Sequence, residues 1–117
     1  MADYRIYHNP RCSKSRQTLA LLEEQGITPD VILYLQTPPD AATLKRLVKQ
    51  LGMKQPHALL RKGEAEYREA GLSADSSADE VIDAMVRYPK LIERPIVVRG
   101  QRAVLGRPPE NVLDLMS

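Results

Sequence analysis

The chain has 117 residues and a formal net charge of +2, which predicts a single domain over 1–117 and argues against a nucleic-acid-binding protein. Its single cysteine excludes an internal disulfide and a cysteine-rich metal site, and with only two histidines we expect no metal. Residues 1–9 hold no signal-like apolar stretch, and the longest aliphatic run is 31–35. We therefore expect a cytoplasmic protein without a membrane segment.

The first third of the chain predicts a strand–helix–strand unit. Residues 5–8 form a short apolar run before the turn signal Asn9-Pro10, and a helical pattern over 14–25 ends at Gly26. Residues 30–35 are continuously apolar, which is typical of a strand buried on both faces. The spacing predicts a parallel pair of strands with a right-handed crossover.

The middle of the chain, at about 40–88, predicts a helical insertion. After Asp40, apolar residues at i, i+3, i+4 and i+7 predict a helix. A short helical turn is predicted at 58–61 and a helix over 64–70, before Gly71. A capping box from Ser77 to Glu80 opens a further helix, which ends at Pro89. We expect His57 to be an ordinary surface residue.

The last part of the chain returns to strands. Residues 95–98 and 103–105 flank Gly100-Gln101, which suits a type II′ hairpin. A final helix is predicted from Pro109 onward. The order βαβ, helices, ββα predicts an α/β protein with a thioredoxin-like fold and a mixed four-stranded sheet.

The only cysteine, Cys12, lies at the predicted strand-to-helix turn. The first helical N–H groups have no partner within the helix, and the positive end of the helix dipole points toward them. Arg11, Lys14 and Arg16 add positive charge nearby. These features favour a nucleophilic thiolate and an anion site. The alternative is that Cys12 is a small buried residue that serves packing alone.

Three arginines differ from those on predicted helix faces. Arg61 follows an apolar pair, Arg94 precedes Pro95 at a strand start, and Arg107 lies at a strand end. Guanidinium groups bind tetrahedral oxyanions in a forked geometry, so together with Cys12 they suggest an oxyanion site. The alternative for each is a solvated surface arginine. We also predict that the Arg94–Pro95 peptide bond is cis, because thioredoxin-like folds place a cis proline there.

Other residues near Cys12 are candidates to support the thiolate. His8 has two candidate roles, as an imidazolium beside the thiolate or as a hydrogen-bond partner of Ser15. The alternative is a histidine at the end of the strand that faces solvent. Arg16 contributes charge.

The chain resembles the glutaredoxin-coupled arsenate reductases of the ArsC family. The resemblance is carried by Tyr7-His8-Asn9-Pro10 with Cys12 and Ser15-Arg16, by Ile32–Leu35 with Pro38-Pro39, by Ala58–Lys62, by Glu93–Val98, by Gly106–Pro109 and by Val112–Asp114. It covers nearly the whole chain. Where the family has Gly-Thr after the cysteine, this chain has Ser13-Lys14.

The resemblance implies an activity and assigns roles to residues. Cys12 is implied as the nucleophile that attacks arsenate, and Arg61, Arg94 and Arg107 as the oxyanion ligands. Glutathione then adds to the arsenic as a co-substrate, and glutaredoxin completes the electron transfer through a mixed disulfide. No bound cofactor is implied. A single protein cysteine suffices, because the resolving thiols come from outside.

Two other functions are open at this point. One is a glutathione-dependent thiol reductase of the same fold without arsenate activity. The other is a non-catalytic regulatory module that resembles the Spx-type transcription regulators and binds a partner. Those regulators commonly carry a Cys-x-x-Cys switch, whereas position 15 here is serine, which excludes an intramolecular redox switch.

Overall fold

The structure is a computed structural model that describes residues 3–116. The chain divides into two compact units: Met1–Thr37 with Arg94–Ser117, and Pro38–Glu93. That the whole chain forms one domain with an insertion at 40–88 stays a prediction.

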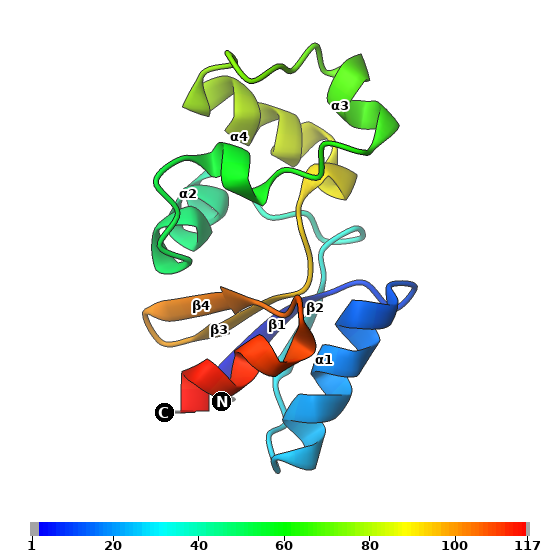
Figure 1. Cartoon of the computed structure of the whole chain (residues 1–117), viewed down its shortest axis with the longest axis vertical. Helices are drawn as coiled ribbons and strands as arrows, with labels where there is room; N and C mark the ends of the chain where they lie inside the picture. The colour runs from blue at the N-terminus through cyan, green and yellow to red at the C-terminus, as the bar shows by residue number, and fades with distance from the viewer. Residues whose placement is uncertain (1–2, 117) are drawn as a thin grey trace. The chain divides into compact units, whose positions relative to one another are not determined.

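The first unit is built on a four-stranded sheet with the order β2-β1-β3-β4 (Figure 1). Its strands are β1 (Tyr4–His8), β2 (Asp30–Leu33), β3 (Ile96–Arg99) and β4 (Arg102–Leu105). β1 and β2 are parallel, whereas β3 is antiparallel to both β1 and β4. The predicted α/β class, the βαβ unit and the mixed four-stranded sheet are confirmed.

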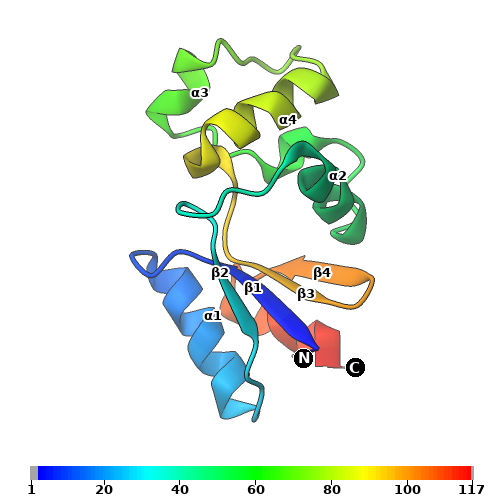
Figure 2. The ribbon, with the colours of Figure 1, turned by 180° about the vertical axis from the view of Figure 1, so that it is seen from behind.

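Two helices cover one face of this sheet. α1 (Ser13–Glu24) and the C-terminal 3-10 helix η3 (Pro109–Met116) lie on the same side of the strands and contact each other (Figures 1 and 2). The core beneath them is built from side chains with at most 1% of their surface exposed, namely Ile6, Leu22, Val97, Val112 and Leu115. Burial of one such side chain contributes about 1.5–3 kcal/mol, and this fixes α1 on the sheet.

The predicted burial of β2 on both faces is wrong. β2 is an edge strand, and Val31 is 47% exposed. The strand is also shorter than predicted, because the carbonyl of Leu33 accepts hydrogen bonds from the N–H groups of Gln36 and Thr37 and the chain turns there. A continuous apolar run shows that a segment suits a sheet, but strand order is set by pairing with distant segments.

The hairpin between β3 and β4 has the predicted turn. Gly100 has φ of +60°, and no residue other than glycine has a positive φ among those described. A positive φ at the first central position alone defines type II′. The Arg94–Pro95 peptide bond is cis as predicted, and the Arg107–Pro108 bond is cis as well.

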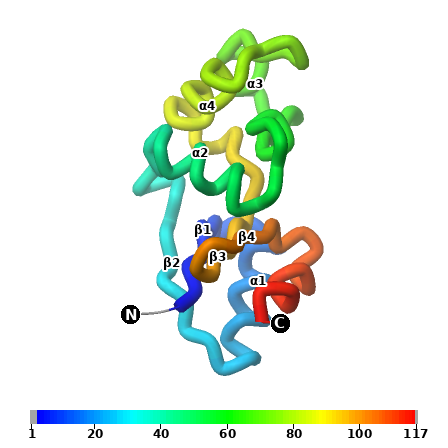
Figure 3. The backbone as a smooth tube through the Cα atoms, turned by 90° about the vertical axis from the view of Figure 1, so that its left-hand side faces the viewer, coloured from blue at the N-terminus to red at the C-terminus, as the bar shows by residue number. Residues whose placement is uncertain are grey.

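The second unit is helical, and Figure 3 follows its chain through α2, α3 and α4 in that order. Its elements are α2 (Ala41–Gln50), η1 (Pro56–Leu59), α3 (Ala65–Glu69), α4 (Ala78–Arg87) and η2 (Pro89–Leu91). The Asp40 side chain caps α2 through the N–H of Thr43, and Ser77 and Glu80 form the predicted capping box of α4. Caps satisfy N–H groups that the helix cannot pair.

A compact apolar core holds the second unit together. Leu44, Leu59, Val81 and Met85 are completely buried within it. The prediction that His57 is an ordinary surface residue is wrong, because its side chain is half-buried and its Nε2 lies 2.6 Å from the carbonyl oxygen of Ser76. Across the described residues, no helix is both long and apolar enough to cross a membrane.

Candidate active site

Cys12 lies at the N-terminus of α1, directly after the turn that follows β1. Its backbone is extended (φ −94°, ψ 123°), and its carbonyl accepts the first helical hydrogen bond, from the N–H of Arg16 at 3.0 Å. The N–H of Cys12 donates to the carbonyl of Asn9 at 3.0 Å, which closes the turn. Its thiol is not part of a disulfide, and the residue is only 9% exposed. The predicted position at a strand-to-helix turn is therefore confirmed.

The surroundings of Cys12 favour its thiolate. Burial opposes ionisation, but the backbone N–H of Ser15, the charge of Arg94, the N–H of Lys14 and the charge of Arg107 together lower the pKa of the thiol. The two N–H groups belong to the first turn of α1, where helical N–H groups have no other partner. A lowered pKa favours the thiolate, which is the nucleophilic form of a cysteine.

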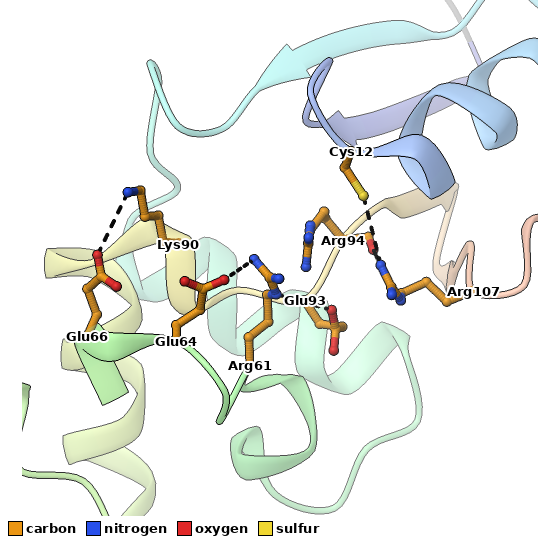
Figure 4. A network of polar contacts seen from close by, with 8 residues as sticks. All are labelled: Cys12, Arg61, Glu64, Glu66, Lys90, Glu93, Arg94 and Arg107. Atoms are coloured by element: carbon orange, nitrogen blue, oxygen red, sulfur yellow. Dashed lines mark hydrogen bonds and ion pairs between the residues drawn. The ribbon is translucent and has the colours of Figure 1, made fainter. Parts of the chain in front are cut away.

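Arg107 contacts the sulfur directly. Its Nη1 donates to Cys12 Sγ at 3.9 Å and to the carbonyl of Arg94 at 3.3 Å (Figure 4). Arg94 lies at the entry to β3, and its charge lowers the pKa of Cys12. The first unit therefore brings Cys12, Arg94 and Arg107 together, as the sequence suggested.

His8 and Ser15 form a buried pair beside this turn. His8 is 6% exposed and Ser15 is completely buried, and His8 Nδ1 lies 2.7 Å from Ser15 Oγ. Ser15 Oγ also accepts a hydrogen bond from the N–H of Asn9 at 3.0 Å. Burial, and to a lesser extent the charge of Arg16, lower the pKa of His8. The geometry fits the hydrogen-bonding role for His8, and the lowered pKa of His8 disfavours the imidazolium.

Arg16 serves the turn rather than the sulfur in this structure. Its Nη1 donates to the carbonyl of Pro10 at 2.9 Å, and the Asn9 side chain accepts from the N–H of Arg11 at 3.0 Å. These contacts hold the segment between β1 and Cys12. Sequence reasoning found Asn9 only as a turn signal and missed that its main chain and side chain organise the turn.

Arg61 belongs to the second unit, where it is paired with two carboxylates. Its Nη1 lies 2.7 Å from Glu64 Oε1, and its Nε lies 3.7 Å from Glu93 Oε1 (Figure 4). The Arg61 side chain is 25% exposed. Glu64 is three residues away in the chain, whereas Glu93 is distant. The role of Arg61 as an oxyanion ligand stays a prediction.

The residues that the structure describes contain no group of three or more histidine, cysteine, aspartate or glutamate side chains that would hold a metal ion. What the first unit offers instead is an ionisable thiol, backbone N–H donors and two guanidinium groups. This arrangement suits nucleophilic attack on an oxyanion.

Comparison with known proteins identifies the family. The family profile of ArsC matches residues 7–115, nearly the whole chain. This chain belongs to the ArsC family. The resemblance to the ArsC family and the thioredoxin-like fold inferred from the sequence are thereby confirmed.

Individual ArsC relatives agree over almost their full length. The uncharacterized protein YfgD of Escherichia coli is 56% identical, with 96% of this chain and 95% of the relative aligned. A Haemophilus influenzae protein named arsenate reductase is 45% identical over 95% of this chain and 97% of its own. The solved structure of the arsenate reductase from Vibrio cholerae superposes with a TM-score of 0.92, at 54% identity and 95% coverage of both chains.

Proposed function

We propose that this protein reduces arsenate to arsenite, with Cys12 as its nucleophile. The observation that carries the proposal is the Cys12 thiol at the start of α1, with a lowered pKa and with Arg107 Nη1 3.9 Å from its sulfur. Relatives that are 43–46% identical over most of the chain carry the name arsenate reductase, and this supports the choice of oxyanion.

The guanidinium groups bind the substrate in this proposal. Arg94 and Arg107 both act on Cys12 electrostatically, so an oxyanion bound between them is held next to the attacking sulfur. Arg61 is proposed as a third ligand on the family resemblance alone. Charged hydrogen bonds of this kind contribute about 1.5–3 kcal/mol each, and they neutralise charge that would otherwise repel the thiolate.

The reaction starts with attack of the Cys12 thiolate on arsenic, and one arsenate oxygen leaves as water. The thiol of glutathione then bonds to the arsenic, and a second oxygen leaves as water. A glutaredoxin thiolate attacks the glutathione sulfur and forms a mixed disulfide, while the electron pair of the arsenic–sulfur bond stays on arsenic and reduces it to As(III). Hydrolysis of the remaining bond to Cys12 releases arsenite and regenerates the thiolate.

Because the protein has a single thiol, its reductants must come from other molecules. The chain has one cysteine, so no second protein thiol resolves the adduct, and two electrons must come from external thiols. We propose glutathione as co-substrate and glutaredoxin as partner, with no bound cofactor. Both occur in a reducing cytosol, where a free Cys12 stays reduced, so we propose a cytoplasmic location.

The test is a coupled assay. The reduced protein is mixed with arsenate, glutathione, glutaredoxin, glutathione reductase and NADPH, and the loss of NADPH is followed. We expect arsenate-dependent turnover that is lost in Cys12→Ser and when glutaredoxin is omitted. Turnover that persists in Cys12→Ser would overturn the proposal. Absence of turnover with a reactive Cys12 would favour a thiol reductase with another substrate, and absence with an inert Cys12 would favour the regulatory module.

A further inference from the structure

The loop that carries Arg107 packs closely against the buried face of α1. Gly106 is buried, and a Cβ atom at this position would lie 2.5 Å from Thr18 Oγ1 and 2.8 Å from Pro95 Cγ. Heavy atoms do not approach so closely, so only glycine fits here. The backbone just before Arg107 is therefore in direct contact with the side chain of Thr18.

A hydrogen bond joins the two segments at this contact. Thr18 is completely buried, and its hydroxyl lies 3.1 Å from the carbonyl oxygen of Gly106 and 2.7 Å from that of Lys14. Carbonyl oxygens only accept, so the hydroxyl is the donor to both and shares its single proton between them. The N–H of Gly106 donates to the carbonyl of Pro95 at 2.9 Å. Both backbone polar groups of Gly106 are thus fixed.

These contacts lie next to the groups that stabilise the thiolate. Gly106 precedes Arg107, whose Nη1 contacts Cys12 Sγ. Lys14 supplies one of the N–H groups that lower the pKa of Cys12. One buried hydroxyl therefore connects the first turn of α1, which carries the cysteine, with the loop that carries the cation.

We propose that Thr18 is a positioning residue that holds Arg107 against Cys12 through the carbonyl of Gly106. Without the Thr18 hydroxyl, the buried carbonyl of Gly106 loses a hydrogen-bond donor, and the loop that carries Arg107 shifts to find another donor. A cation that moves away from a sulfur stabilises its thiolate less, because Coulomb interaction falls with distance. The proposal rests on the proposed roles of Cys12 and Arg107, but it is tested on the thiol and not on arsenate.

The experiment compares Thr18→Ser with Thr18→Ala, because the two variants differ only in the hydroxyl. The rate of alkylation of Cys12 by iodoacetamide is measured as a function of pH. We expect Thr18→Ser to keep the wild-type profile. We expect Thr18→Ala to move the midpoint upward and to lower the rate below the midpoint by about two- to threefold, which is less than the tenfold change of a full pKa unit. If Thr18→Ala does not fold, Thr18→Val, which fills the same volume, replaces it.

Two further measurements separate positioning from general destabilisation. Ile6→Val makes a cavity of similar kind in the core of the first unit, where Ile6 is completely buried, without removing a hydrogen bond. We expect it to leave the alkylation profile unchanged. In an Arg107→Gln background, Thr18→Ala should cause no additional shift. Equal shifts for Thr18→Ala and Thr18→Ser, or a full Thr18→Ala shift in the absence of Arg107, would overturn the proposal.

Failure of this proposal is distinct from failure of the proposed function. Arsenate reduction with an unchanged alkylation profile in Thr18→Ala would remove the role of Thr18 and leave the reductase intact. A shifted profile in a protein that does not reduce arsenate would establish the positioning role and refute the substrate.

Discussion

Replacement of Arg107 by glutamine removes a cation that contacts the Cys12 sulfur. The charge lies 3.9 Å from Sγ. Two unit charges at this distance interact by about 1 kcal/mol in water and by about 4 kcal/mol at an effective dielectric constant of 20. Arg107 is exposed, so the lower value applies. Since a full pKa unit corresponds to about 1.36 kcal/mol, we expect about a fivefold smaller thiolate fraction at a pH below the midpoint.

The assay is the pH dependence of alkylation of Cys12 by iodoacetamide, because only the thiolate reacts. The midpoint for Arg107→Gln should lie above that of the wild type. The difference should shrink in 1 M salt, where the screening length falls to about 3 Å from about 10 Å at 0.1 M. A fall in rate at saturating pH would instead indicate blocked access to the sulfur.

Arg102→Gln is the matched control for the loss of one positive charge. Arg102 lies at the opposite end of β4 from Arg107, and its Nη2 donates to the carbonyl of Asp114 at 2.8 Å. We expect this variant to keep the wild-type profile. If Arg107→Gln also keeps it, or if both variants shift it equally, the direct electrostatic role of Arg107 is refuted.

Three further predictions concern other parts of the chain. Arg94→Gln should raise the alkylation midpoint more than Arg107→Gln does, because the charge of Arg94 lowers the pKa of Cys12 more strongly; a smaller shift than that of Arg107→Gln would contradict this. Ser77→Ala should lower the free energy of unfolding by about 1 kcal/mol in urea denaturation, because it removes the side-chain cap of α4, whereas Ser77→Asp should retain most of the stability. The pKa of His8 lies below its usual 6.5, so on acidification the unfolded chain takes up a proton before the folded protein does. Stability should therefore fall as the pH drops below about 6.5, and a His8→Gln variant whose denaturation midpoint shows the same pH dependence would refute this.

Local sequence signals predicted the elements that carry the site. The capping box at Ser77 and the turn at Gly100 were both found, because a few neighbouring residues determine them. The position of Cys12 at the start of α1 followed from a turn signal next to a helical pattern. Part of the lowering of its pKa follows from that position, because the N–H groups of Ser15 and Lys14 belong to the first turn of the helix, whereas the charges of Arg94 and Arg107 come from distant parts of the chain.

Features that depend on distant parts of the chain were not predictable. The edge position of β2 depends on which strands pair with β1, and the apolar run over 30–35 does not encode this. Thr18 and Gly106 are 88 positions apart in the sequence, and no local sequence motif at either position predicts their contact. The pairing of Arg61 with Glu93 likewise becomes visible only in the folded second unit.

Measurement of the arsenic product is the most direct test of whether this protein reduces arsenate through Cys12. The protein is incubated with arsenate, glutathione and glutaredoxin, and arsenate and arsenite are separated by chromatography and quantified. We expect one arsenite for each pair of glutathione molecules oxidised, and none above the protein-free background for Cys12→Ser. Arsenite formation at an equal rate in the wild type and in Cys12→Ser would contradict the role of Cys12 as the nucleophile.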